Sequence, residues 1–299
     1  MFQRKQFRLR LPRRTLALGA RTLVMGVLNV TPDSFSDGGN FLSAETAVER
    51  ALEMERNGAD ILDIGGESTR PSAAPVSARN ELSRILPVLE ALRGKLRIPI
   101  SVDTRKSEVA EAALAVGAEM VNDVSGLRND PRLAEVARSS RAPLILMHMR
   151  GTPRTMQQGP FARSVMRDVM DGLREAIARA RLAGLKKSQI LLDPGIGFGK
   201  SYLQNFEILA RLPEFASLGC PIVIGTSRKA FLGKALARPG EAPLLPDERL
   251  LGTAATVTAS ILGGAHIVRV HDVAEIVRIA RVADAIVASN NKKREHEPR

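Results

Sequence analysis

Short runs of apolar residues recur along the chain, each four to six residues long. They are too short for helices and rich in Val, Ile and Leu, and most are apolar throughout. Such runs are typical of parallel strands that are covered on both faces. We therefore predict eight strands, at residues 23–28, 60–65, 98–102, 119–124, 143–147, 189–192, 221–225 and 266–270.

The segments between these runs have helical patterns. One follows Asp247, a predicted N-cap, and ends at Gly263 and Gly264. Eight strand–helix repeats predict a single-domain (β/α)8 TIM barrel of the α/β class. A doubly wound sheet is the alternative, but evenly spaced units without a large second domain favour closure. Four further segments stop just before a glycine, the usual left-handed helix end, and they are 44–57, 80–93, 107–116 and 164–183.

The two ends of the chain differ from its middle. The sequence FRLRL at residues 7–11 alternates as a strand does, so we predict an N-terminal hairpin that closes the bottom of the barrel. The expected organisation is a basic N-terminal segment (1–21), one barrel domain (22–288) and a basic C-terminal tail (289–299).

The net charge of +12 is concentrated at the termini. Residues 1–21 carry +7, residues 292–299 carry +2, and only +3 is left for the rest of the chain. We therefore expect solvated basic ends rather than a basic stripe on the body. A nucleic-acid groove would also need aromatic side chains for stacking, and the chain has one Tyr and no Trp. No nucleic-acid partner is expected.

The remaining composition favours the cytoplasm. The single cysteine, Cys220, excludes an internal disulfide framework and suits a reducing compartment. Arg13 and Arg14 resemble a twin-arginine signal, but Arg21 interrupts the apolar segment that should follow. No apolar run approaches the ~18 residues of a membrane span, so no membrane association is expected.

The stretch DPGIGFGKS at residues 193–201 ends like a phosphate-binding P-loop. The spacing excludes that interpretation, because the position that needs the first glycine is Pro194. The third glycine of a dinucleotide-binding loop is also missing, since Lys200 stands there. We expect Lys200 to be solvated or to begin a helix, and Asp193 to be the important residue of this loop.

Polar residues follow nearly every predicted strand. In a TIM barrel the active site lies at the carboxyl ends of the strands. One polar strand end means little, but so many of them predict a polar pocket at the barrel mouth. The residues are Asn29, Glu67 to Arg70, Asp103, Asn122, Asp123, His148, Asp193, Ser227 to Lys229, Arg269 and His271.

The cationic residues of this pocket predict an anion site. Arg269 and His271 are two positions apart on one strand, so both face the same way. With Lys229 and with Asn29 of the neighbouring first strand, they are suited to an anionic leaving group such as a diphosphate.

The acceptor residues of the pocket predict a different partner. A carboxylate accepts two parallel hydrogen bonds from an N–H and NH₂ edge, as in guanine or a pterin. Asp103, Asn122 and Asp193 form such an acceptor side. Two long connections, 30–43 and 66–80, have the composition of mobile lids beside this mouth.

Eight ordered motifs give the chain a resemblance to the dihydropteroate synthase family over about residues 24 to 285. They are MGVLNVTPDSFSDGG, DIGGESTRP, SVDTRK, VNDVSG, LMHMRGTPRTMQ, LLDPGIGFGK, GTSRKAFLG and HIVRVHDV.

The resemblance implies a transferase of folate biosynthesis. It would condense 6-hydroxymethyl-dihydropterin diphosphate with 4-aminobenzoate to give 7,8-dihydropteroate and pyrophosphate. It also implies Mg²⁺, a homodimer and sulfonamides as competitors. The implied mechanism is dissociative, because pyrophosphate leaves first and the aryl amine then attacks the trapped cation.

The resemblance also implies roles for individual residues. Asn29 would help place Mg²⁺ and the diphosphate, and Asp103 would in addition stabilise positive charge as the C–O bond breaks. Lys229 would bridge the pterin and aminobenzoate sites. The other implied roles are pterin binding by Asp103, Asn122 and Asp193, pyrophosphate binding by Arg269 and His271, a lid contribution from Thr69 and Arg70, and an aminobenzoate site lined by Phe198 and Ser227.

Simpler interpretations remain open for several residues. Asp123 and Asp272 are as well explained as turn formers or caps, and His148 as a brace for the fifth strand. A pterin-binding methyltransferase shares the acceptor side, although it does not need the SRK and RVH cations or the two lids. A non-catalytic, inactive relative is disfavoured by the complete motifs.

Overall fold

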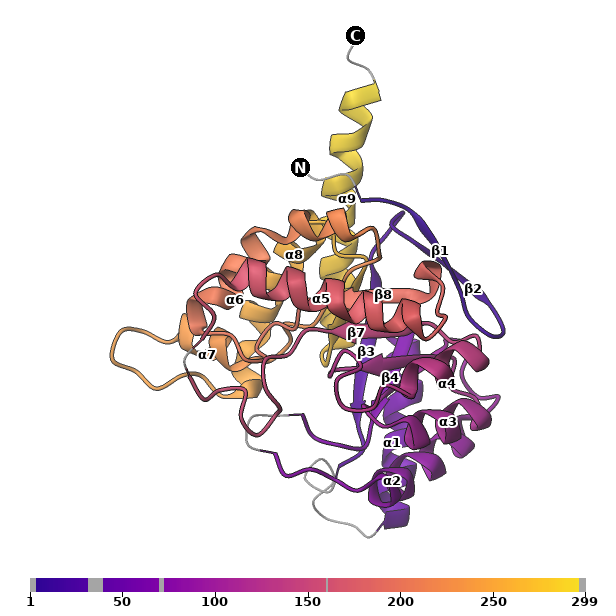
Figure 1. Ribbon diagram of the computed structural model, residues 1–299. Coiled ribbons are helices and arrows are strands. Elements are labelled where there is room, and N and C mark those ends of the chain that lie inside the picture. The colour runs from indigo at the N-terminus through magenta and orange to yellow at the C-terminus, as the bar shows by residue number, and fades with distance from the viewer. Residues whose placement is uncertain (1–3, 32–39, 70–72, 160, 296–299) are drawn as a thin grey trace.

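Eight parallel strands form a closed barrel in the computed structural model, which describes residues 4–31, 40–69, 73–159 and 161–295 (Figure 1). Their order is β8-β7-β6-β5-β4-β3-β10-β9, and a bridge between Leu192 and Ile222 joins the two ends. The predicted TIM barrel is confirmed. The strands are β3 (Leu23–Asn29), β4 (Ile61–Gly65), β5 (Ile100–Asp103), β6 (Met120–Asp123), β7 (Leu144–Met147), β8 (Ile190–Asp193), β9 (Val223–Ile224) and β10 (Ile267–Val270).

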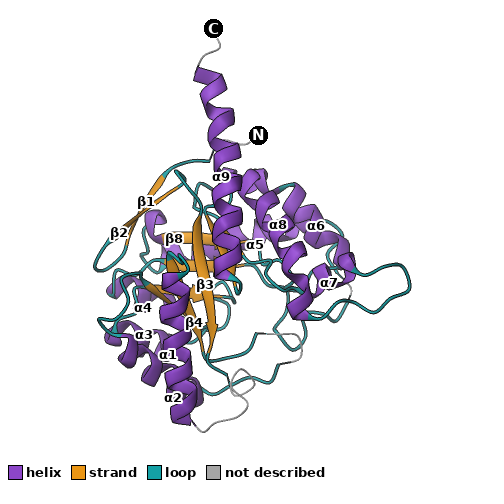
Figure 2. Ribbon diagram, turned by 180° about the vertical axis from the view of Figure 1, so that it is seen from behind, coloured by secondary structure: helices purple, strands orange, loops and turns teal. Residues whose placement is uncertain are grey.

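Helices surround this barrel, as Figure 2 shows from behind. The predicted glycine stops are confirmed, since Gly58, Gly94, Gly117 and Gly184 all have positive φ. The predicted N-cap is wrong, because α8 begins at Leu250, after a short 3₁₀ turn. The helices are α1 (Asn40–Arg56), α2 (Ala78–Leu92), α3 (Ser107–Val116), α4 (Leu133–Ser139), α5 (Val165–Leu182), α6 (Tyr202–Ala210), α7 (Ala230–Leu236), α8 (Leu250–Leu262) and α9 (Val273–Glu295), with 3₁₀ turns η2 (Lys187–Gln189), η3 (Leu212–Leu218) and η4 (Pro246–Arg249).

The predicted hairpin is present below the barrel. Strands β1 (Phe7–Arg10) and β2 (Thr15–Leu18) pair antiparallel. One side of the hairpin is apolar and packs against the inward-facing residues at the start of the barrel strands, so the hairpin closes that end. This buried cluster consists of Leu9, Leu11, Leu18, Leu23, Met25, Ile61, Met120, Ile145, Leu191, Val223 and Ile267.

The expectation of solvated basic residues holds only in part for the N-terminal segment. Arg4 is buried, and its guanidinium donates to the hydroxyl of Thr22 at 2.8 Å and pairs with Asp284 of α9 at 2.6 Å. Arg14 pairs with Glu119, which precedes β6, at 2.9 Å. These two arginines attach the segment to the barrel and α9, whereas the other basic residues are exposed, namely Lys5, Arg8, Arg10, Arg13 and Arg21.

Alternation along each strand divides the barrel interior into layers. On β6 and β8 the inward residue near the strand start is apolar and the residue two positions later is polar, as for Met120 and Asn122 and for Leu191 and Asp193. On β10, for example, Ile267 lies in the lower cluster, and Arg269 is the next residue on the same face. The outward residues form the larger core beneath the helices. The polar layer therefore lies above an apolar layer inside the barrel.

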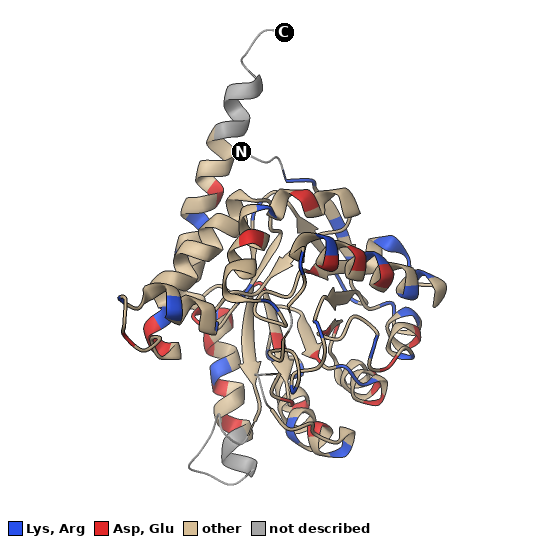
Figure 3. Cartoon of the chain, turned by 60° about the vertical axis from the view of Figure 1, so that its left-hand side comes forward, with Lys and Arg blue, Asp and Glu red and all other residues tan. Residues whose placement is uncertain are grey.

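Acidic and basic residues both lie on the outer helices, for example on α1 and α5 (Figure 3).

Within the described part of the chain, no helix is long and apolar enough to cross a membrane.

His266 joins the segment before the hairpin to the barrel and makes one pH-dependent hydrogen bond. Its Nδ1 accepts from the N–H of Ile222 at 3.0 Å, so its Nε2 carries the proton and donates to the carbonyl of Lys5 at 2.9 Å. The bond from Ile222 needs the neutral ring, because a protonated Nδ1 cannot accept. Burial lowers the pKa of His266 to about 4, although the bond to Lys5 opposes this shift.

We expect the wild type to lose more stability than His266→Gln as the pH falls from 7 to 4.5. An unfolded histidine takes up a proton near pH 6.5, whereas folded His266 does so only near pH 4. Between these values the unfolded state binds more protons, so stability falls with pH by about 2–3 kcal/mol. Urea unfolding of both proteins measures the difference, and parallel pH profiles would contradict it.

Candidate active site

The polar residues predicted from the strand ends lie together at one end of the barrel. Asp103 and Asn122 are paired neighbours on β5 and β6, and Asp193 ends β8. Arg269 lies on β10, which pairs with β3, the strand that ends in Asn29. The parallel register brings side chains from distant parts of the sequence to one mouth.

A buried ionic network forms the floor of this mouth. Arg269 donates from Nε to Asp63 Oδ2 at 2.6 Å and from Nη2 to Asp103 Oδ2 at 2.7 Å. The amide Nδ2 of Asn122 donates to the same Asp63 oxygen at 3.0 Å. One guanidinium therefore holds two carboxylates, and one carboxylate holds two donors.

Burial and charge set the ionisation of this network. Burial raises the pKa of Asp103 to about 7, with Arg269 opposing the shift and the charge of Asp63 adding to it. Burial alone would lower the pKa of Arg269, but the charges of Asp63 and Asp103 outweigh it and raise that pKa. Arg269 is therefore a permanent cation, and it favours the ionised form of the carboxylate at 2.7 Å from it.

The loop after β8 shapes the other side of the mouth. The Asp193 carboxylate accepts the N–H of Gly195 at 2.6 Å, and Phe198 N–H donates to the Gly195 carbonyl at 3.0 Å. Burial raises the pKa of Asp193, whereas the bond from Gly195 opposes this. The glycines thus allow a tight turn that fixes the carboxylate.

Lys200 is not solvated, which corrects the prediction from the sequence. It is only 3% exposed, and its Nζ contacts His148 Nδ1 at 3.0 Å and donates to the His148 carbonyl at 2.9 Å. Burial lowers the Lys200 pKa to about 7 and, with the Lys200 charge, lowers that of His148 to about 2. A neutral His148 accepts at Nδ1, so this pair joins the β8 loop to β7, as the interpretation of His148 as a brace requires.

Lys229 and Phe198 pack against each other on one wall of the mouth. The Lys229 ammonium lies 3.9 Å from the centre of the Phe198 ring, a cation–π distance. Burial lowers the pKa of Lys229 to about 8, and Arg269 adds to the shift, whereas Asp193 and Asp103 oppose it. A cation and an aromatic face thus share one wall.

His271 is neutral in this structure, contrary to its predicted place among the cations. Burial lowers its pKa to about 3, and the charges of Arg269, Arg228 and Lys229 lower it further. Its backbone N–H donates to Ser227 Oγ at 3.1 Å, and its Nδ1 lies 3.0 Å from the same oxygen. Ser227 therefore orients the ring.

Comparison with known proteins places this site in a family. The sequence model described as pterin binding enzyme matches residues 25–271. The dihydropteroate synthase of Synechocystis sp. is 50% identical, over 90% of this chain and 91% of that protein. The chain belongs to the dihydropteroate synthase family.

Solved structures of family members have the same architecture. The Xanthomonas albilineans dihydropteroate synthase with 4-aminobenzoic acid is 43% identical, with a TM-score of 0.87 over 95% of this chain and 99% of that one. The same enzyme in complex with 7,8-dihydropteroate is 41% identical, with a TM-score of 0.83 over 94% of this chain and 99% of that one. The resemblance found in the motifs is confirmed.

Of the two residues expected in the second lid, only one lies among the described residues. Thr69 is half-buried in the connection after β4, and Arg70 lies outside the described residues, as does much of the connection 30–43. In the same connection Glu67 pairs with Arg105 at 2.8 Å and Lys106 at 2.7 Å. The roles of Thr69 and Arg70 stay predictions.

Two aspartates at strand ends have structural partners. Asp123 accepts the N–H groups of Ser125 at 2.7 Å and Leu127 at 2.6 Å, which is the turn-forming role weighed from the sequence. Asp272 pairs with Arg228, which also pairs with Asp247 at 2.9 Å.

Asp63 is the site residue that sequence reasoning missed. It is fully buried within DILDIG, a run interpreted as apolar. The alternation of side chains along the strand could have revealed it. Asp63 stands two positions before Gly65, and Gly65 pairs in the sheet with Asp103. Residues two apart on a strand share a face, so Asp63 had to point into the barrel.

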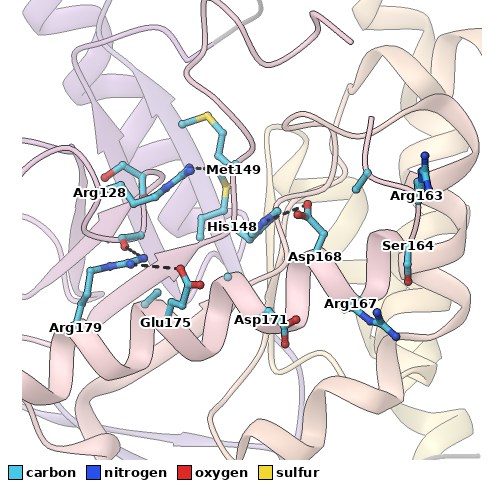
Figure 4. A pocket seen from close by; sticks show the side chains of 16 residues that line it. Arg128, His148, Met149, Arg163, Ser164, Arg167, Asp168, Asp171, Glu175 and Arg179 are labelled. Atoms are coloured by element: carbon cyan, nitrogen blue, oxygen red, sulfur yellow. Dashed lines mark hydrogen bonds and ion pairs between the residues drawn. The ribbon is translucent and has the colours of Figure 1, made fainter. Parts of the chain in front are cut away.

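A separate cleft of about 500 Å³ lies between the carboxyl ends of β6 and β7 and α5 (Figure 4). His148 Nε2 faces Asp168 there at 3.6 Å, and Arg179 faces Glu175 at 3.6 Å. None of Asp103, Asn122, Asp193 and Arg269 lines it, so it is distinct from the mouth.

Replacing Gly195 with alanine is expected to unfold this synthase more easily and to weaken binding at Asp193. Gly195 has a φ of 69°, and a Cβ there would overlap the carbonyl oxygen of His148. Such a substitution costs more than about 1 kcal/mol. Thermal unfolding measures the loss, and Gly240→Ala, at φ 86° with open space around it, separates overlap from backbone strain. Equal losses in both variants would contradict the account.

Proposed function

We propose that this protein condenses (7,8-dihydropterin-6-yl)methyl diphosphate with 4-aminobenzoate, giving 7,8-dihydropteroate and pyrophosphate in folate biosynthesis. It would thus be a transferase of the pterin-methyl group. The observation that carries the proposal is the mouth itself, where the buried side chains of Asp103, Asn122 and Asp193 lie beside the cations Arg269 and Lys229. The relatives' names support the same reaction.

The pterin ring would bind at Asp103, Asn122 and Asp193. All three are buried, and each has an acceptor oxygen to offer to ring N–H and NH₂ groups. As the C–O bond to the diphosphate breaks, positive charge grows on the pterin methylene, and the Asp103 carboxylate would stabilise it electrostatically. No covalent nucleophile is required for this step.

The pyrophosphate leaving group and 4-aminobenzoate would bind at the other sides of the mouth. Arg269, His271 and Asn29 would hold the pyrophosphate, with the neutral His271 acting as a hydrogen-bond donor. Lys229 would lie between the two substrates, and Phe198 and Ser227 would line the aminobenzoate site. The aryl amine would attack the pterin cation and then lose its proton. Sulfonamides, which resemble 4-aminobenzoate in shape and charge, would compete there.

Mg²⁺ is proposed as a companion of the diphosphate. No group of three or more His, Cys, Asp or Glu side chains able to hold a metal occurs among the described residues. The described residues therefore offer Mg²⁺ few ligands, and most of its ligands would come from phosphate and water, which is the usual arrangement. The amide oxygen of Asn29 would then be the protein's contribution, and the ion would neutralise phosphate charge.

We propose that the protein forms a homodimer. We also propose that it is located in the cytoplasm. Apolar side chains are exposed on neighbouring helices, with Leu251 of α8 at 76% and Val282 of α9 at 64%. Leu245, before α8, is also exposed. A self-complementary contact would cover such side chains.

Product analysis tests the proposal. The protein, incubated with the pterin diphosphate, 4-aminobenzoate and Mg²⁺, should form dihydropteroate, identified by chromatography and mass. Omission of either substrate should abolish it. If the protein instead transfers a methyl group from a methylated folate, the methyltransferase alternative replaces the proposal.

A further inference from the structure

Asp63 lies beneath the pterin-binding side chains and is the best connected carboxylate of the mouth. It is fully buried, and its Oδ2 accepts from both Asn122 and Arg269. Its Oδ1 has no hydrogen-bond partner among the described residues. An ionised carboxylate buried with one oxygen unpaired costs stability rather than adding to it. A purely structural role therefore does not explain this residue.

Asp63 determines which way the Asn122 amide points. An ionised carboxylate can only accept hydrogen bonds, so the amide nitrogen of Asn122 must be the atom that faces Asp63, at 3.0 Å. The amide oxygen then points away from Asp63. This orientation follows from the chemistry of the pair.

The same carboxylate restrains Arg269. The Nε of Arg269 is bound to Asp63 at 2.6 Å, which leaves the Nη2 to reach Asp103 at 2.7 Å. A guanidinium carries five donors in a fixed fork. Holding its Nε from below therefore fixes the plane in which the fork meets Asp103.

We propose that Asp63 is a positioning residue that sets the hydrogen-bond polarity of the ring pocket, so that Asn122 offers an acceptor oxygen alongside Asp103 and Asp193. The inference rests on the proposed function. An all-acceptor pocket selects heterocycles with an N–H and NH₂ edge, as in a 2-amino-4-oxopteridine, and rejects the same ring without its 2-amino group. A site built for such hydrogen bonds discriminates strongly, because its groups stay unpaired with the wrong ring.

Asp63→Leu tests the inference. Leucine has a similar volume but accepts no hydrogen bond, so Asn122 can turn its NH₂ toward the ligand. We expect roughly 100-fold weaker binding of the 2-amino ring, the order for losing one bond and gaining a donor–donor clash. Binding of the ring without the amino group should change little.

Asp63→Asn is the conservative variant. Both donors reach the same Asp63 oxygen, Oδ2, so an amide oxygen in that place can accept from both Asn122 and Arg269, with its NH₂ at the unpartnered Oδ1 place. The 2-amino preference should therefore stay within about tenfold of the wild type, which corresponds to about 1.4 kcal/mol. A merely structural role predicts no difference in this preference between the two variants. Asp63→Asn also carries the test if Asp63→Leu does not fold, because a lost preference in it would overturn the inference.

Ser101→Ala is the matched control. Ser101 is fully buried on β5, pairs in the sheet with Asp63, and has no partner for its hydroxyl among the described residues. Its loss should leave the preference unchanged.

Calorimetry of the full-length variants with both rings, without aminobenzoate, gives the answer. Collapse of the preference in Asp63→Leu and its retention in Asp63→Asn support the inference. A preference kept in Asp63→Leu, an equal loss for both rings, or loss of the preference in Asp63→Asn or Ser101→Ala would overturn it. Wild type that binds neither ring would instead overturn the proposed function, and the inference with it.

Discussion

Arg269→Met is expected to lower the free energy of unfolding by about 3–5 kcal/mol, the usual cost of removing one partner from a buried ion pair. Arg269 lies between Asp63 and Asp103, at 2.6 Å and 2.7 Å. Without it two buried carboxylates face each other with no compensating charge. The methionine restores packing volume but not the two hydrogen bonds.

The pH dependence of that loss identifies its cause. Without the guanidinium, which opposes the upward shift, the pKa of Asp103 rises further, and protonation of Asp103 relieves the repulsion. The loss should therefore be smaller at pH 5 than at pH 8 when unfolding is followed in denaturant. Arg211→Met is the control, because Arg211 pairs with Glu207 and Glu214 on the exposed surface, and it should have little effect at either pH. An Arg269→Met protein as stable as the wild type would contradict the network described above.

Lys229→Ala is expected to lower kcat/KM by about 10²–10³-fold, the cost of removing one preorganised charge from an active site. Lys229 is a half-buried cation that lies over the Phe198 ring and interacts with the charges of Asp193 and Asp103. Its loss should affect the use of both substrates, since it lies between their proposed sites. Lys234→Ala is the control, because Lys234 lies 4.8 Å from the Tyr202 ring, outside the mouth.

The pH profile separates the charge of Lys229 from its shape. Burial lowers the Lys229 pKa to about 8, so the cation is lost as the pH rises through that value, and wild-type kcat/KM should fall above about pH 8. Arginine keeps its proton there. Lys229→Arg, even if slower, should therefore keep its activity constant to higher pH. An unchanged alkaline limb in that variant would show that another group titrates.

The sequence predicted the barrel because its signals are local. Each strand is a short apolar run, and four helices end at glycines that adopt positive φ. The alternation of FRLRL likewise predicted the hairpin. The strand ends predicted which polar side chains meet, since parallel strands bring their carboxyl ends to one edge.

What the sequence did not predict depends on partners far along the chain. Asp63 lies within an apolar run, and its meaning comes from Asn122 and Arg269, which lie on other strands. Lys200 was taken as solvated, because nothing local shows that its ammonium finds His148 across the loop. Arg4 was likewise assigned to a solvated end, although Asp284 of α9 receives it.

Pyrophosphate release tests the central claim most directly. Purified protein with the pterin diphosphate, 4-aminobenzoate and Mg²⁺ should release one pyrophosphate for each dihydropteroate formed. Asp103→Ala should reduce the rate by about 10²-fold or more, because the developing charge loses its carboxylate. Absence of release by the wild type, or equal rates for wild type and Asp103→Ala, would contradict the assignment of this barrel mouth as the site of pterin transfer.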